Sequence, residues 1–317
     1  MMPFGTTSAP GTWGPRRMGK RVSGPIPFGG QPAYLVLMIT PPNFNLAVLA
    51  RLAAASVMTA GLVAGAVAAP ASAHPKETID YVALGDSYSA GLGAGSTNDF
   101  PCLKTPGSFP DRIDARKSVN LVANASCSGA ITAHIPVQAV ALTDDTDLVT
   151  ITVGGNDLQY STVVATCLGF TPGDCTASLR TARQYAENQL AWDLQTVFAG
   201  IQQQSDAHVV VMGYPHLFSP QFGRLGPNTA AAKAMNEATT VLNDVIESAA
   251  DEAGFQYVDV TKEFRNHGIG APDPWIHGVG ADAALHPTAE GYKKGYFKTF
   301  KSEVQLNKIQ KKSHSYK

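Results

Sequence analysis

Short apolar runs alternate with helical stretches along this chain, and this pattern limits it to few folds. Helical patterns follow the third and fourth runs, at about 177–204 and 228–253, and a last helix is expected to begin near Pro287 and to run past Phe300. Alternating strands and helices predict a parallel sheet covered by helices on both faces. The five strand candidates are 79–84, 119–123, 148–153, 208–212 and 255–260.

Four short sequence segments rich in polar residues and glycine, called blocks below, are candidates for a functional site. Residues 85–89 (GDSYS), 126–130 (SCSGA) and 154–157 (GGND) follow the first, second and third strands, and residues 285–292 (LHPTAEGY) lie near the C-terminus. The carboxyl ends of parallel strands meet at one edge, where the functional groups of α/β proteins cluster. We therefore expect the four blocks to meet there.

In this order, the four blocks resemble the SGNH or GDSL hydrolase family over about residues 78–301. The segment 273–276 (DPWI) is also similar to the secreted actinobacterial lipases and esterases of that family. The resemblance implies an α/β fold, a three-layer α/β/α sandwich with a five-stranded parallel sheet. It also implies a serine hydrolase that cleaves carboxylic esters.

The blocks supply the groups that acyl transfer needs. A serine hydroxyl requires an adjacent base, so Ser87 is the candidate nucleophile and His286 the candidate base. By analogy with the family, the oxyanion hole is formed by the backbone N–H groups of Ser87 and Gly129 and the side-chain amide of Asn156. Taken singly, each residue could be a helix cap or a turn residue. Their joint occurrence in order favours catalysis.

The third catalytic partner departs from the family pattern. An acid usually stands three residues before the histidine, but that position is Ala283, and the nearest acid, Asp282, stands four before His286. Asp282 could reach His286 through a bent loop, or the carbonyl of Ala283 or Ala284 could accept the Nδ1 proton. A few secreted members of the family are similar in using such a carbonyl. Asp282 stands one residue further from His286 than the family's acid does, and in an extended loop a shift of one residue points a side chain in another direction. This slightly favours the carbonyl.

The substrate is expected to be a lipid or other small acyl ester, as for a lipase, esterase or phospholipase. The alternatives are a carbohydrate O-acetyl esterase and a non-catalytic surface-binding protein on the same fold. Trp275 and Tyr214 are candidate substrate-binding residues, against the plainer interpretation that they belong to the core. No metal motif occurs in the sequence, and the mechanism needs no cofactor, so we expect neither.

Charge excludes one class of partner. Residues 74–292 hold 24 acidic and 11 basic residues, a net charge of −13. Nucleic-acid binding would require the opposite sign.

The segment 302–317 is a Lys-rich tail, which we interpret as a solvated helix end. The alternative is transient contact with an anionic membrane or lipid surface. We expect a monomer.

The N-terminal 73 residues indicate export. An apolar run at 52–69 follows Arg51 and precedes a small-x-small cleavage pattern at Ala71 and Ala73. We expect residues 1–73 to be an extension and secretory signal peptide cleaved near Ala73, with a catalytic domain at 74–301. A retained membrane anchor is the alternative.

Four cysteines in an exported chain predict two disulfides. Three pairings are possible, and local closure favours the bonds Cys102–Cys127 and Cys167–Cys175.

Overall fold

The computed structural model describes residues 78–96 and 99–315, with side chains as far as residue 310. The predicted extension, signal peptide and cleavage site lie outside the described residues. Within the described ranges, no helix has the length and apolarity needed to cross a membrane.

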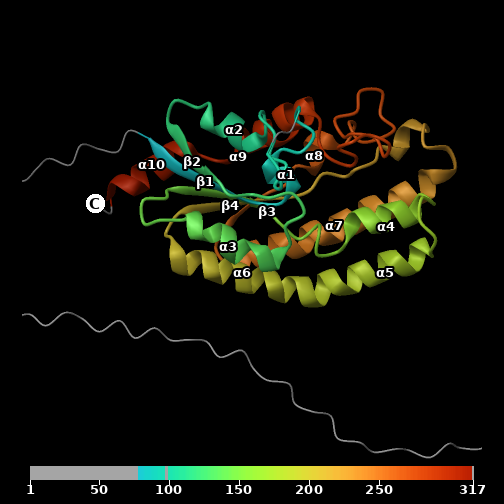
Figure 1. Ribbon diagram of the computed structural model, residues 1–317, viewed down its shortest axis with the longest axis horizontal. Helices are drawn as coiled ribbons and strands as arrows, with labels where there is room; N and C mark the ends of the chain where they lie inside the picture. The colour runs from blue at the N-terminus through green and yellow to red at the C-terminus, as the bar shows by residue number, and fades with distance from the viewer. Residues whose placement is uncertain (1–77, 97–98, 316–317) are drawn as a thin grey trace, which may run out of the picture. The chain divides into compact units, whose positions relative to one another are not determined.

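The predicted five-stranded parallel sheet is confirmed (Figure 1). Its order is β2-β1-β3-β4-β5, and each neighbouring pair is parallel. Every residue of β3 is buried, and so is nearly all of β1, because helices cover both faces of the sheet. The strands are β1 Ile79–Gly85, β2 Val119–Asn124, β3 Leu148–Thr152, β4 His208–Met212 and β5 Gln256–Val258.

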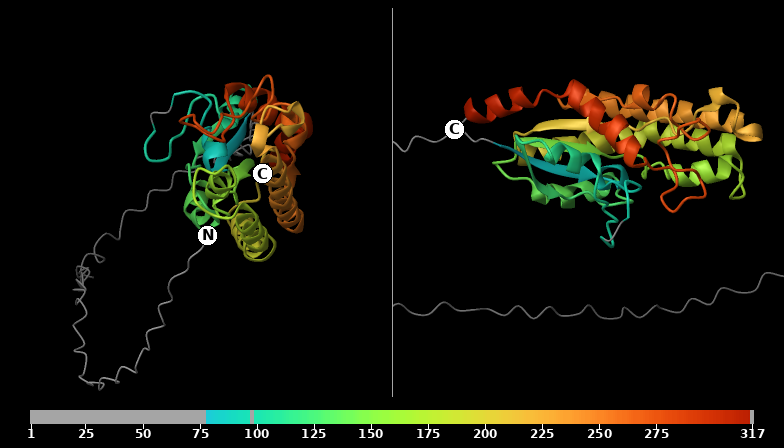
Figure 2. Two further views of the ribbon diagram at one scale, coloured as in Figure 1. Left: turned by 90° about the vertical axis from the view of Figure 1, so that its right-hand side faces the viewer. Right: turned by 90° about the horizontal axis from the view of Figure 1, so that it is seen from above.

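Helices form a layer on each face of the sheet (Figure 1). One layer contains α2 (Phe109–Asp114), α8 (Thr261–Phe264), α9 (Lys298–Glu303) and α10 (Leu306–Ser315). The other contains α3 (Ile135–Gln138), α4 (Tyr160–Cys167), α5 (Cys175–Tyr185), α6 (Ala191–Gln204) and α7 (Thr229–Glu252). In this second layer α6 and α7 lie side by side, as both figures show (Figure 2).

The long predicted helices are present, with one difference at the C-terminal end. A π-helical turn, Ala186–Leu190, joins α5 to α6 in one continuous helical run. Helix α7 lies between β4 and β5, where a helix was predicted at 228–253. The last helix was predicted to begin near Pro287; it begins at Ala289 and continues through the π-helix Gly291–Phe297 into α9, so that Pro287 itself lies just before it. The reason is that Pro287 pairs with Ile276 in an isolated β-bridge.

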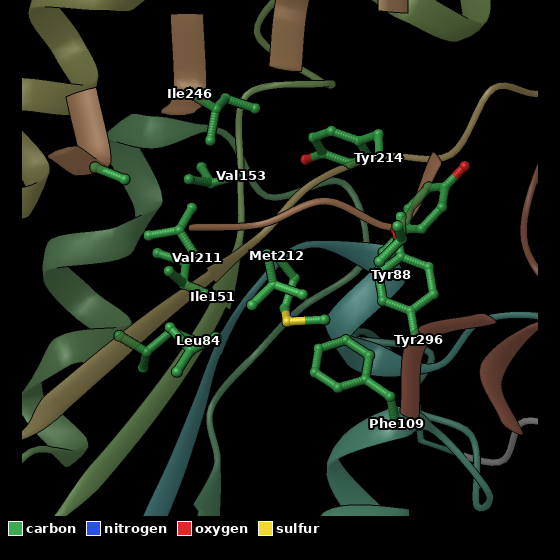
Figure 3. Close-up of a cluster of buried hydrophobic side chains, with 14 of the residues drawn as sticks. Leu84, Tyr88, Phe109, Ile151, Val153, Val211, Met212, Tyr214, Ile246 and Tyr296 are labelled. Carbon is green, nitrogen blue, oxygen red and sulfur yellow. The ribbon is translucent and has the colours of Figure 1, made fainter. Parts of the chain in front are cut away.

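The core joins strand residues to a group of aromatic rings from the helices. Figure 3 shows Met212 between strand side chains such as Ile151 and the rings of Phe109 and Tyr296. Phe109 and Tyr296 stack with ring centroids 5.3 Å apart, and both are fully buried. This aromatic group lies beneath α1 (Ser87–Ala90), the short helix that follows β1.

Both predicted disulfides are present. Cys102–Cys127 connects the loop after α1 to the loop after β2, where the Ser128 N–H also donates to the Cys102 carbonyl at 2.9 Å. Cys167–Cys175 connects the end of α4 to the start of α5.

Replacing both Cys102 and Cys127 with serine should lower the free energy of unfolding by about 3.5 kcal/mol, because the bond closes a loop of 25 residues. The matched Cys167→Ser, Cys175→Ser variant should lose about 2.5 kcal/mol, because its loop spans 8 residues. Urea unfolding measures both losses. A larger loss from the shorter loop would contradict this order.

Candidate active site

The first block forms a tight strand-to-helix turn that presents Ser87. Asp86 caps α1, because its carboxylate accepts the Tyr88 N–H at 2.9 Å, and Ser87 is the first residue of the helix. The N–H groups of a first helical turn have no acceptor within the helix, so the Ser87 N–H can donate to a ligand. Gly85 must be glycine, since a Cβ there would lie 2.3 Å from the Thr152 carbonyl oxygen.

His286 lies against Ser87. Its Nε2 is 2.7 Å from the Ser87 Oγ, across 199 residues of sequence. Its Nδ1 is 2.8 Å from the Ala284 carbonyl oxygen. A carbonyl can only accept, so Nδ1 carries the proton in the neutral ring, and Nε2 is left to accept the proton of the Ser87 hydroxyl.

The Asp282 carboxylate does not occupy the position of a third catalytic partner. Asp282 is exposed, whereas the Ala284 carbonyl accepts from Nδ1 and the Ala283 carbonyl accepts the backbone N–H of His286 at 3.1 Å. The reason is local: Leu285 has a φ of 68°, and this left-handed turn folds the imidazole back onto its own chain. Of the two alternatives, the geometry therefore favours the main-chain carbonyl, specifically that of Ala284.

Burial controls the protonation of the histidine. Removal from water disfavours the charged ring and lowers the pKa of His286, while the hydrogen bond to the Ala284 carbonyl opposes this effect. Because the pKa lies below its ordinary value of 6.5, the ring is neutral at pH 7 and can accept a proton.

The two other predicted oxyanion donors lie at the same edge of the sheet. Gly129 has a φ of 82°, is exposed, and follows β2. Asn156 follows β3, and its side-chain amide donates one hydrogen bond to the Ala130 carbonyl at 2.9 Å. That bond joins the second block to the third, and it leaves the second amide N–H of Asn156 for a ligand.

Asp86 has a role that the sequence interpretation missed. Its carboxylate is buried and accepts hydrogen bonds from the hydroxyls of Tyr214, at 2.5 Å, and Thr152, at 2.7 Å. Burial raises the pKa of Asp86 to about 6, although both hydroxyls oppose the shift. Tyr214 also accepts the Gly155 N–H at 3.3 Å, so it connects Asp86 to the residue before Asn156. The sequence did contain a sign of this role, since Asp86 directly precedes the predicted nucleophile Ser87.

A pocket opens beside Ser87, Asn156 and His286. Its walls also include Tyr160, Tyr214, Pro215, Leu217, Leu242 and Leu285. The Tyr160 hydroxyl donates to the Met235 carbonyl at 2.7 Å and lies 2.6 Å from the Thr239 Oγ1, so it is paired within the wall. The wall therefore presents mainly apolar surface to a ligand.

The two predicted substrate-binding residues differ in position. Tyr214 lines the pocket, but its hydroxyl is bonded to Asp86, so only its ring can contact a substrate. Trp275 does not line this pocket: its ring stacks on His267, with ring centroids 3.5 Å apart, and meets Phe264 edge-on, with centroids 5.9 Å apart. Its part in substrate binding stays a prediction, and these contacts favour the alternative that it belongs to the core.

Metal chemistry has no ligand set in the part of the chain that the structure describes. Within residues 78–96 and 99–315, no three His, Cys, Asp or Glu side chains are grouped so as to hold an ion. The site instead brings together a serine, a neutral histidine and several N–H donors. This arrangement can attack a carbonyl carbon and stabilise the resulting oxyanion.

Comparison with known proteins agrees with this chemistry. The GDSL-like lipase/acylhydrolase family matches residues 83–294. Lipase 1 of Streptomyces coelicolor is 33% identical over 247 residues, which cover 76% of this chain and 92% of that protein.

Two solved structures are similar along their whole length. The extracellular lipase of Streptomyces rimosus and the phospholipase A1 of Streptomyces albidoflavus NA297 are each 34% identical to this chain. Their TM-scores are 0.67 and 0.65, and the match covers 72% of this chain and 100% of each of theirs. From the family match and these relatives, the chain belongs to the GDSL-like lipase/acylhydrolase family.

Proposed function

We propose that this ester hydrolase cleaves acyl esters of lipids through an acyl-enzyme on Ser87, with His286 as general base. The 2.7 Å contact between His286 Nε2 and Ser87 Oγ carries the proposal. It is within the reach that proton transfer between a nucleophile and its base requires.

The reaction proceeds in two acyl transfers. His286 takes the Ser87 proton as Oγ attacks the ester carbonyl, and the oxyanion accepts from the N–H groups of Ser87 and Gly129 and the amide of Asn156. The imidazolium then protonates the leaving alcohol. Water, deprotonated by the same ring, attacks the acyl-enzyme and releases the acid and the Ser87 hydroxyl.

The Ala284 carbonyl orients the ring throughout, in place of a carboxylate. It accepts from Nδ1 at 2.8 Å and therefore keeps Nε2 free for proton transfer. A neutral carbonyl stabilises the imidazolium less than a carboxylate would, and this agrees with the lowered pKa of His286.

The pocket walls support a lipid acyl chain as the bound group. Leu217, Leu242 and Leu285 offer apolar surface, and the hydroxyls of Tyr160 and Tyr214 already have partners in the protein. A carbohydrate O-acetyl ester would require free polar partners for its sugar hydroxyls. The names of the similar Streptomyces proteins, lipase and phospholipase A1, point to the same substrate class.

Export of the mature chain forms part of the proposal. Two disulfides are typical of proteins that fold in oxidising compartments, and one similar protein is an extracellular lipase. Residues 1–73 would be removed near Ala73, and residues 74–301 would act as a monomeric catalytic domain. The Lys-rich end would make transient contact with lipid surfaces. Its helix α10 is tied to the body by Ile309, which is buried.

A series of p-nitrophenyl esters from acetate to palmitate should show kcat/KM rising with chain length. Each buried methylene contributes about 0.8 kcal/mol, or about fourfold, until the pocket is full. Ser87→Ala should abolish turnover of every ester. Turnover of acetate alone would contradict the lipid substrate, and unchanged turnover by Ser87→Ala would contradict the serine mechanism.

Asp282→Ala should change kcat/KM only a few-fold, because the exposed carboxylate does not contact His286. Steady-state kinetics on one ester measures the effect, with His286→Ala as the control that should lose at least about 10⁴-fold. A loss of about a thousandfold in folded Asp282→Ala would make Asp282 the third catalytic residue.

The acid limb of the pH profile of kcat/KM should have its midpoint below 6.5. The base must be neutral, and burial lowers the pKa of His286, so activity persists to lower pH than an ordinary histidine allows. The Asp282→Ala variant should show the same midpoint. A midpoint above 6.5 would indicate a charge partner for the imidazolium.

A further inference from the structure

Tyr88 links α1, the helix that begins at Ser87, to the loop that carries His286. It directly follows Ser87, and its hydroxyl donates to the Leu285 carbonyl at 2.7 Å, across 197 residues of sequence. Its ring is buried, with an exposed fraction of 8%. No step of the proposed reaction uses this hydroxyl.

The residue that Tyr88 holds is the turn on which the geometry of His286 depends. Leu285 has a left-handed backbone conformation that residues other than glycine seldom adopt. Its N–H donates to the His277 carbonyl at 3.0 Å, and its own carbonyl accepts from Tyr88. These two bonds secure both sides of a turn without which the imidazole could not reach the Ala284 carbonyl, two residues before it.

The ring of Tyr88 also restricts the imidazole directly. The ring centroids of Tyr88 and His286 are 5.2 Å apart. Tyr214 lies beside Tyr88 (Figure 3) and meets its ring edge-on, also with centroids 5.2 Å apart. The hydroxyl of Tyr214 donates to Asp86. Tyr88 is therefore fixed by the same network that places Ser87.

We propose that Tyr88 is a positioning residue: its hydroxyl holds the Leu285 turn, and the turn keeps Nδ1 of His286 on the Ala284 carbonyl. The orientation and tautomer of the base are then set by a tyrosine acting through the main chain, in place of the carboxylate of a Ser-His-Asp triad. This inference rests on the proposed roles of Ser87 and His286.

The test is Tyr88→Phe, which removes only the hydroxyl. The variant should lose at least about tenfold in kcat, because small displacements of a catalytic group are costly, with KM changed by less than about twofold. In ¹⁵N-histidine-labelled protein, the Nδ1–H resonance of His286 should shift or broaden as its bond to Ala284 is lost. His286→Ala assigns that resonance.

Tyr81→Phe is the matched control. Tyr81 is another fully buried tyrosine, and its hydroxyl bonds Thr150 within the sheet, away from the pocket. Both variants should show similar losses in Tm, since each loses one buried hydroxyl bond. Tyr81→Phe should keep the wild-type kcat and the wild-type resonance.

Three results would overturn the role of Tyr88. These are a kcat no lower than that of Tyr81→Phe, an unchanged Nδ1–H resonance, or a loss expressed in KM. Failure of the proposed function would be seen separately, as activity in Ser87→Ala. The resonance does not depend on turnover, so it still tests Tyr88 in that event.

Discussion

The buried carboxylate of Asp86 joins the ends of three strands at the site. It caps α1 through the Tyr88 N–H and so places Ser87 at the start of the helix. It also accepts from Thr152 at the end of β3 and from Tyr214 just after β4. A buried carboxylate is costly unless its oxygens are satisfied, so the three strand ends must stay in register around it.

Four tyrosines connect α1 and Asp86 to the loops around the site through hydrogen bonds of their hydroxyls. Tyr214 connects Asp86 to Gly155, and Tyr88 connects the nucleophile helix to Leu285. Tyr292 donates to the Leu92 carbonyl at 2.9 Å, just beyond α1, and Tyr296 donates to the Gly213 carbonyl at 2.9 Å. Each ring packs in the core while its hydroxyl holds a loop backbone. Core packing and site geometry are therefore stabilised by the same side chains.

The sequence was most informative where a local pattern has one physical solution. Apolar runs bounded by glycine lie within a residue or two of the observed strands, because strands covered on both faces are apolar throughout. Ser87 was predicted from its place after the first strand, and His286 from the order of the four blocks. The pairing of Cys102 with Cys127 followed from proximity along the chain.

The sequence was least informative where packing between distant segments decides the outcome. Trp275 stacks on His267 and meets Phe264 edge-on, and nothing in its local sequence distinguishes that place from a pocket wall. Pro287 is suited to the first turn of a helix, yet its pairing with Ile276 keeps it outside. In both cases a tertiary contact overrides a local preference.

The alternation of strands and helices and the meeting of the four blocks at one edge of a parallel sheet were predictable from the residues alone. They depend on hydrophobic period and on chain order, which a sequence contains. The acceptor for His286 was not predictable in this way: the Ala284 carbonyl accepts, and Asp282 does not, because the left-handed turn at Leu285 sets that direction. Such a turn is unfavourable for leucine in isolation, and it is held here by contacts with Tyr88 and His277 from elsewhere in the chain.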